Sequence, residues 1–140
     1  MFGSKKNSSH VSVEKFSSLL AGNTTITGDL EFEGGLKVNG TIKGNVKYKK
    51  DSNSLLALSA EGRIEGNIHS YDALIDGTVV GDLEVEHLLE LHANAHITGN
   101  ITYRQLSMEN GVSVDGRLIK ITDDDSKAAE VLELPAPQTP

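Results

Sequence analysis

One short pattern returns six times along this chain and limits its possible folds more than any other feature. It reads apolar, polar, Gly, Asn or Asp, apolar, as in Ile64-Glu65-Gly66-Asn67-Ile68, although the last copy has Arg117 after its glycine. Successive glycines of the pattern lie 16, 22, 15, 18 and 17 positions apart, and they are Gly28, Gly44, Gly66, Gly81, Gly99 and Gly116. Self-similarity of this kind indicates one structural unit stacked on itself.

Each repeat unit has the residue pattern of short strands. Apolar and polar residues alternate between Ile26 and Ile121, which predicts strands with one buried face. A second apolar motif, such as Leu36-Lys37-Val38, falls midway through each unit, so one coil should contain three strands joined at tight corners. Stacking would align the apolar residues in three columns: Ile26/Ile42/Ile64/Val79/Ile97/Val114, Leu30/Val46/Ile68/Leu83/Ile101/Leu118 and Phe32/Tyr48/Ser70/Val85/Tyr103. We therefore predict an all-β fold, a single-stranded β-helix (solenoid) of about six coils.

The residues at the predicted corners support this fold over a β-sandwich. Glycine permits a positive φ and a close approach of two backbones, and a sandwich would not require it in register in every unit. The residue after the glycine tolerates the left-handed region and can bond to neighbouring backbone, so stacking should form a ladder of Asp29, Asn45, Asn67, Asp82 and Asn100. We interpret Asp29 and Asp82 as turn residues rather than as catalytic acids.

The repeats divide the chain into three parts. Residues 1–22 are rich in Ser, Lys and Asn and should form a disordered tail, in which Val11, Val13, Phe16, Leu19 and Leu20 could form either a short amphipathic turn or the first strand of a cap. Residues 23–121 should form the β-helix, in which Lys47–Ser54 is a loop inserted at a corner of the second coil. Residues 122–140 are acidic and end in a Pro-containing stretch; we expect a disordered tail with one short helix over Ser126–Leu134.

Composition and motifs exclude several classes of function. The net charge of −7 disfavours nucleic-acid binding as a main role, and the absence of Cys excludes disulfides and thiolate metal sites. Neither a secretory signal peptide nor a membrane-spanning stretch is present, and neither are nucleotide-binding glycine motifs. His87, His92 and His96 are the only clustered metal-ligand residues, while His10 and His69 are isolated. We interpret them as surface histidines and expect no enzyme, no catalytic residues, no metal site and no cofactor.

A β-helix has two ends, each of which exposes unpaired strand edges over an apolar shaft. At one end we predict contacts through Ile26, Leu30, Leu36 and Val38, and at the other through Val112, Val114, Leu118 and Ile121. Unless the tails fold back as lids, copies of the chain should stack head to head or head to tail. The product would be a filament that needs no nucleotide to grow.

The repeat residues of this chain resemble those of the bactofilins, a family of bacterial cytoskeletal proteins. The resemblance covers about Ile26–Ile121 and rests on Ile64–Ile68, Ile75–Leu83 and Ile97–Leu106. It implies a right-handed triangular β-helix that polymerises through its terminal coils into non-polar filaments. It also implies a cytoplasmic protein, peripheral on the inner face of the cytoplasmic membrane, which recruits cell-wall synthases or hydrolases and thereby contributes to cell shape.

The N-terminus carries a candidate membrane-binding tip. Met1 and Phe2 are apolar and stand beside Lys5 and Lys6, and an apolar tip next to cations can insert at an anionic membrane surface. Two other functions remain open from the sequence. One is a trimeric β-helix enzyme, either an acyltransferase or a zinc hydratase, and the other is a monomeric adhesin-like binding protein.

Overall fold

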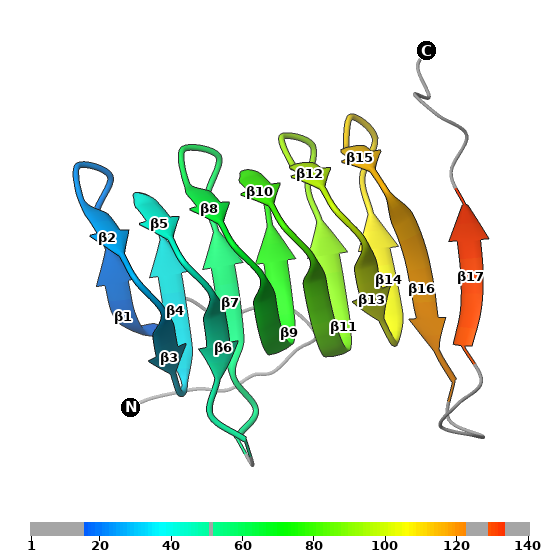
Figure 1. The fold of residues 1–140 in the computed structure, drawn as a ribbon, viewed down its shortest axis with the longest axis horizontal. Helices are drawn as coiled ribbons and strands as arrows, with labels where there is room; N and C mark the ends of the chain where they lie inside the picture. Colours follow the sequence, from blue (N-terminus) through cyan, green and yellow to red (C-terminus); the bar gives the residue numbers. More distant parts are fainter. Residues whose placement is uncertain (1–15, 51, 123–128, 134–140) are drawn as a thin grey trace, which may run out of the picture.

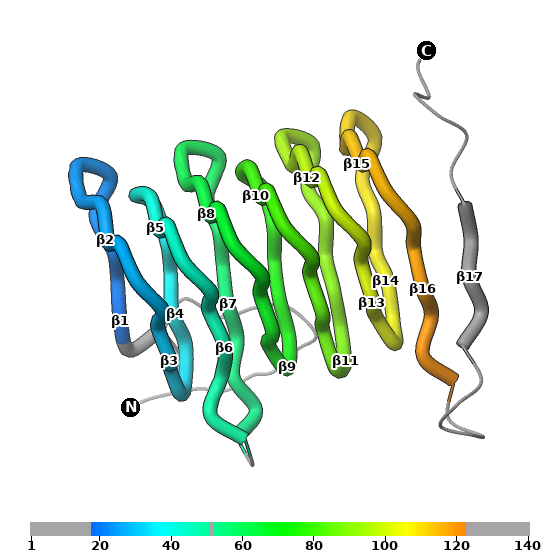
Figure 2. Tube along the Cα trace, in the orientation of Figure 1, coloured from blue at the N-terminus to red at the C-terminus, as the bar shows by residue number. Residues whose placement is uncertain are grey.

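The computed structural model describes residues 16–50, 52–122 and 129–133, and it is a β-solenoid of about six coils, as predicted. The chain winds from one end of the column to the other, so the first and last described strands lie at opposite ends (Figure 1). The tube in Figure 2 shows the successive coils side by side along this axis.

Each coil contributes one strand position to each of three faces. The first face consists of β2 (Thr25–Thr27), β5 (Thr41–Lys43), β8 (Arg63–Glu65), β10 (Thr78–Val80), β12 (His96–Thr98) and β15 (Ser113–Asp115). The second face consists of β3 (Leu30–Phe32), β6 (Val46–Tyr48), the starts of β9 (Ile68–Ile75) and β11 (Leu83–Leu91), β13 (Ile101–Tyr103) and β16 (Arg117–Ile121). The third face consists of β1 (Phe16–Leu20), β4 (Gly35–Val38), β7 (Leu55–Leu58), the ends of β9 and β11, and β14 (Gln105–Met108).

The strands of each face pair in parallel, and their register follows the predicted columns. Ile26 pairs with Ile42, Ile42 with Ile64, and the alignment continues through Val79 and Ile97 to Val114. The second column, from Leu30 to Leu118, is equally continuous. Only β17 (Ala129–Glu133) departs from this pattern among the described strands, because it pairs antiparallel with β16.

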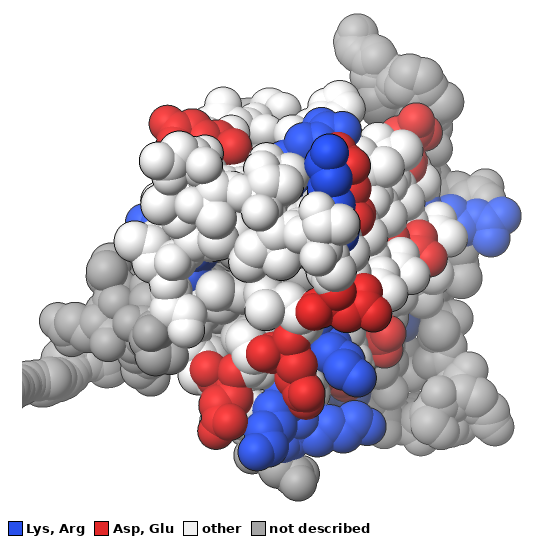
Figure 3. All heavy atoms as spheres, turned by 60° about the vertical axis from the view of Figure 1, so that its left-hand side comes forward, with Lys and Arg blue, Asp and Glu red and all other residues white. Residues whose placement is uncertain are grey.

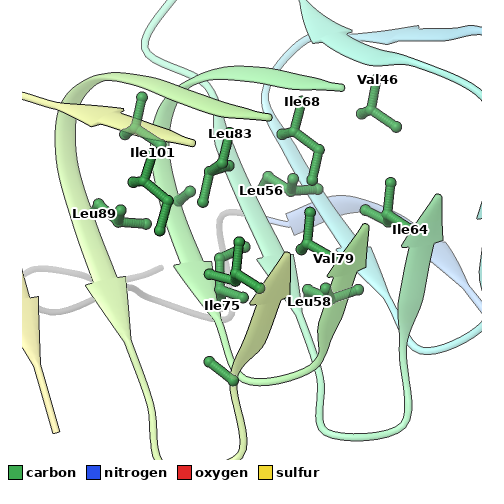
Figure 4. Packing of buried hydrophobic residues seen from close by; sticks show 14 of the residues in the cluster. Val46, Leu56, Leu58, Ile64, Ile68, Ile75, Val79, Leu83, Leu89 and Ile101 are labelled. Atoms are coloured by element: carbon green, nitrogen blue, oxygen red, sulfur yellow. The ribbon is translucent and has the colours of Figure 1, made fainter. Parts of the chain in front are cut away.

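The interior of the column is a shaft of aliphatic side chains. Ile42, Leu56, Ile64, Val79 and Leu83 are fully buried, and Figure 4 shows side chains from different faces meeting in the same interior. Each such side chain contributes roughly 1.5–3 kcal/mol when it leaves water. Since a coil contacts only its neighbours, the stability of the fold is shared along the stack.

The recurring glycines are required by close contact between coils. Gly66 has a φ of 156°, and a Cβ added there would lie 2.0 Å from the carbonyl oxygen of Gly44 in the coil before it. Gly81 would meet the oxygen of Gly66 at 2.1 Å in the same way. Any larger residue would therefore push neighbouring backbones apart.

The predicted ladder of Asn and Asp residues forms beside these glycines. The Asn67 N–H donates to Asn45 Oδ1 at 2.9 Å, and the Asp82 N–H donates to Asn67 Oδ1 at 3.0 Å. The same bond joins Asn45 to Asp29 and Asn100 to Asp82. Each side chain thus accepts from the backbone of the next coil, which supports the interpretation of these residues as structural.

Two terminal segments differ from the expectations. Strand β1 lies within residues 1–22, which we had expected to be a tail, and it pairs with β4 as the possible cap strand would. The expected helix over Ser126–Leu134 is wrong, because residues 129–133 form β17. Residues of this segment extend beside the β16 edge, whose backbone bonding outweighs a weak helical preference. Of the predicted Lys47–Ser54 insertion, Lys47 and Tyr48 belong to β6, and the rest connects β6 to β7 in a loop that projects beyond the other corners (Figure 1).

Candidate functional site: the two ends of the solenoid

The N-terminal end of the column presents the edges of β2 and β3. Strand β2 is the terminal strand of the six-stranded first face, and within the described residues β3 pairs only with β6. Ile26 and Leu30 on these strands are half-buried and pack against the core. In Figure 3, which brings this end forward, much of the surface is uncharged, and acidic and basic side chains lie near its upper and lower borders.

Gly28 at this end shows that no coil of the described chain lies beneath it. An added Cβ at Gly28 would meet nothing within 4 Å, whereas at Gly44 it would meet the Gly28 carbonyl oxygen at 2.0 Å. The corner at Gly28 therefore has open space where every later corner has a neighbouring backbone.

Leu36 and Val38 do not lie on the exposed edge that the sequence suggested. Both are on β4, whose outer edge pairs with β1, and their side chains are buried. The placement was wrong because β1 adds one strand to the third face. The side chains that this outer strand provides are Leu20, half-buried against the core, and Leu19, which is 63% exposed.

The C-terminal end is partly covered. Strands β14 and β15 end the third and first faces, and half-buried Val112 and Val114 lie in or beside β15. On the second face, β17 pairs with the whole of β16, so Leu118 and Ile121 lie on a strand whose outer edge is already bonded. Within the described residues, the terminal coil thus has two faces that end in β14 and β15 and one face that β17 extends.

The sides of the column carry paired charges. Arg63 Nε donates to Glu65 Oε2 at 2.6 Å, and Lys43 is aligned with Glu65 on the neighbouring strand. The hydrogen bond from Arg63 lowers the pKa of Glu65, as do the charges of Arg63 and Lys43, while desolvation opposes them. These pairs make this flank of the column charged.

The histidines that the sequence clustered do not form a metal-ligand group among the described residues. His87 Nδ1 lies 2.8 Å from Asp72 Oδ1, while His92 lies between Glu90 and Glu109. His69, interpreted from the sequence as isolated, instead approaches Glu84 and Glu86 on the adjacent strand.

Comparison with known proteins agrees with an assembling column. The bactofilin family, described as polymer-forming cytoskeletal, matches residues 18–119. The chain belongs to this family. Bactofilin BacO of Myxococcus xanthus (strain DK1622) is 24% identical over 114 residues, which cover 78% of this chain and 87% of BacO. No solved structure matches the chain. The family match confirms the expected resemblance and the expected polymer-forming, cytoskeletal rather than enzymatic, class of protein.

The candidate membrane-binding residues Met1, Phe2, Lys5 and Lys6 lie outside the described residues. Within the described ranges, no helix has the length and apolar character needed to cross a membrane.

Proposed function

We propose that this bactofilin polymerises end to end, without nucleotide, through the uncovered strands of its terminal coils. The observation that carries the proposal is that β2 and β15 are the two terminal strands of the first face and lie at opposite ends of the column (Figure 1). The outer edges of these strands have no partner strand within the described residues and can accept the backbone of another copy, and the half-buried Ile26 and Val114 can complete their burial in the same contact.

The two ends should contribute unequally to this contact. At the N-terminal end β2 and β3 are available together, whereas at the C-terminal end β17 already occupies the edge of β16. A second copy that approaches the C-terminal end therefore meets β14 and β15 directly, but meets β17 on the second face. We propose that contacts at this end use Val112 and Val114. Leu118 and Ile121 stabilise the terminal coil without contacting the second copy.

Pelleting and negative-stain microscopy of Val114→Arg test the proposal. A charge on the terminal coil should abolish filaments while the β signal in circular dichroism remains. The matched control is Val80→Arg, because Val80 lies on β10 in the middle of the column and is 40% exposed. Ile26→Arg should repeat the effect at the other end.

The same preparations should be imaged with and without ATP and Mg²⁺. Filaments in both conditions support assembly by strand contact alone. Discrete trimers in both conditions would contradict the proposal, and so would filaments that persist in both Val114→Arg and Ile26→Arg.

We also propose that the filaments are cytoplasmic and bind the inner face of the cytoplasmic membrane through Met1, Phe2, Lys5 and Lys6. The support is the apolar and cationic composition of this tip, since each Lys adds about 1 kcal/mol of attraction to an anionic surface. Deletion of residues 1–6 should release the protein from anionic vesicles without loss of filaments. Vesicle binding that survives the deletion would exclude the tip as the anchor.

We further propose that residues 23–121 form the assembling body and that the filament positions cell-wall synthases or hydrolases. The support is the resemblance to bactofilins together with flanks that stay exposed when the ends are joined. Cells that produce Val114→Arg should then lose the localised insertion of labelled cell wall, whereas cells that produce Val80→Arg should keep it. Localised insertion in both strains would contradict this role.

A further inference from the structure

The outer side of the second face brings one histidine against two glutamates. His69 on β9 pairs with Glu84 on β11. Glu86 lies two residues further along β11, so its side chain leaves the strand on the same side as that of Glu84. His69 Nε2 lies 2.6 Å from Glu86 Oε2 and 3.9 Å from Glu84 Oε2.

An aromatic ring contacts the histidine of this group. The pairing of β9 with β11 is irregular between Val85 and Leu88, where β11 passes from the second face to the third, so Glu86 lies just beyond the regular ladder. The ring of Tyr48 contacts the His69 ring edge to face, with centroids 5.1 Å apart. The imidazole is therefore positioned from one side by an aromatic ring and faces carboxylates elsewhere.

The spacing of the three side chains suits a metal ion. Ligand atoms of His69, Glu84 and Glu86 all lie within 4.8 Å of one another. Two ligands of a tetrahedral zinc ion are about 3.4 Å apart when each bond measures about 2.1 Å. The separations of 2.6 and 3.9 Å bracket that value, so modest rotations of the glutamate side chains would bring all three ligands to bonding distance.

The charge of the group favours a divalent cation. Two carboxylates face one imidazole, so the group remains negative whether or not His69 is protonated. Lys47 is aligned with His69 on the other neighbouring strand, where it opposes cation binding at longer range. A neutral imidazole ligand favours zinc and related transition metals over Mg²⁺ or Ca²⁺, which prefer oxygen ligands.

We propose that His69, Glu84 and Glu86 bind a divalent transition-metal ion of the zinc type. Through these ligands the ion joins β9 to β11 and so fastens two successive coils on the flank of the column. Water would complete the coordination. The site lies in the middle of the stack and does not depend on assembly at the ends.

His92 provides a matched control because it also has two carboxylate neighbours. Its Nε2 lies 3.3 Å from Glu90 Oε1, and its Nδ1 lies 3.5 Å from Glu109 Oε2. These two nitrogens point away from each other, so one ion cannot use both pairs. His92→Ala removes a histidine with similar neighbours but should leave the proposed site intact.

Competition between the full-length protein and a chromophoric chelator for ZnCl₂ measures the affinity. His69→Ala, Glu84→Gln and Glu86→Gln should each weaken zinc binding by about tenfold or more, since each removes one ligand. His92→Ala should bind as the unaltered protein does, and MgCl₂ should not compete. Equal affinities of the unaltered protein and His69→Ala, or an equal loss in His92→Ala, would overturn the proposal.

Two further readouts separate a coordination site from general attraction to an acidic surface. Cobalt(II) should give the visible absorption of a tetrahedral complex in the unaltered protein and not in His69→Ala. Zinc should raise the thermal unfolding midpoint of the unaltered protein and of Val114→Arg, because the coils are fastened within one chain. If zinc shifts the midpoints of the unaltered protein and of His69→Ala by the same amount, the ion does not join these strands.

Discussion

Replacement of Gly66 by alanine tests why glycine recurs at the corners of the column. Gly66 has a φ of 156° and Gly28 has a φ of 128°, so alanine is strained in the backbone at both positions. This strain costs of order 1–3 kcal/mol at either site. Only at Gly66 does the new Cβ also collide with a neighbouring coil, at 2.0 Å from the Gly44 oxygen and 2.5 Å from its carbonyl carbon.

The collision should cost more than the strain. Relief requires the two coils to separate by about 1 Å, because ordinary contacts of this kind exceed about 3 Å. That movement would stretch the bond from Gly44 N–H to Glu65 O, 2.9 Å, and the bond from Asn67 N–H to Asn45 Oδ1, 2.9 Å. Two weakened hydrogen bonds at about 1 kcal/mol each and overpacking at about 1–3 kcal/mol give a difference of about 3–5 kcal/mol between the two variants.

Urea denaturation followed by circular dichroism measures this difference. It should be done at a low protein concentration and repeated at a lower one, so that assembly does not contribute to the midpoint. Gly66→Ala should lose about 3–5 kcal/mol more unfolding free energy than Gly28→Ala. If the two losses agree within about 0.5 kcal/mol, backbone conformation alone explains the glycines, and the reasoning from close contact is refuted.

Three other variants test separate parts of the fold. Asn67→Ala removes one hydrogen bond of the ladder and should lower the free energy of unfolding, measured by urea denaturation, by about 1 kcal/mol. Asn67→Asp keeps an acceptor oxygen and should retain most of that free energy. Leu83→Ala empties a fully buried position and should cost about 2–5 kcal/mol, measured in the same way. The lowered pKa of Glu65 means that its stabilising effect is present above the unfolded pKa and is lost as the pH falls through the folded pKa. The free energy of unfolding should therefore fall less steeply between about pH 5 and pH 3 in Glu65→Gln than in the unaltered protein.

The repeat pattern was sufficient to predict the coils and their register. Because a slip by one residue would turn the apolar side of an alternating strand outward, and because the glycines mark the corners, aligning Ile26 with Ile42 fixed the rest of the column. The ladder followed for the same reason, since the residue after each glycine must lie above its counterpart. That alignment also placed His69 beside Glu84, and the pairing was missed because histidines were compared along the chain rather than across coils.

The ends were harder to predict because their strands lie outside the repeat. Strand β1 has no glycine motif, and nothing in Ala129–Glu133 signals an antiparallel partner for β16. Glu86 likewise lies beyond the last regular pair of β9 and β11, so the stacking register alone did not place it beside His69. Regular stacking could therefore be read from the sequence, whereas departures from it could not.

The uniform step between coils gives the column a fixed unit of length. Neighbouring strands are about 4.8 Å apart, so about six coils span roughly 29 Å along the axis. In a fibre built without gaps, diffraction should show one meridional reflection at the strand step and a longer spacing that counts the coils in each molecule. Adding or removing one glycine-to-glycine unit would change that longer spacing by a single step in a head-to-tail fibre and by two steps in a non-polar fibre, whose repeat holds two molecules, so the sequence sets the period of the fibre in whole increments.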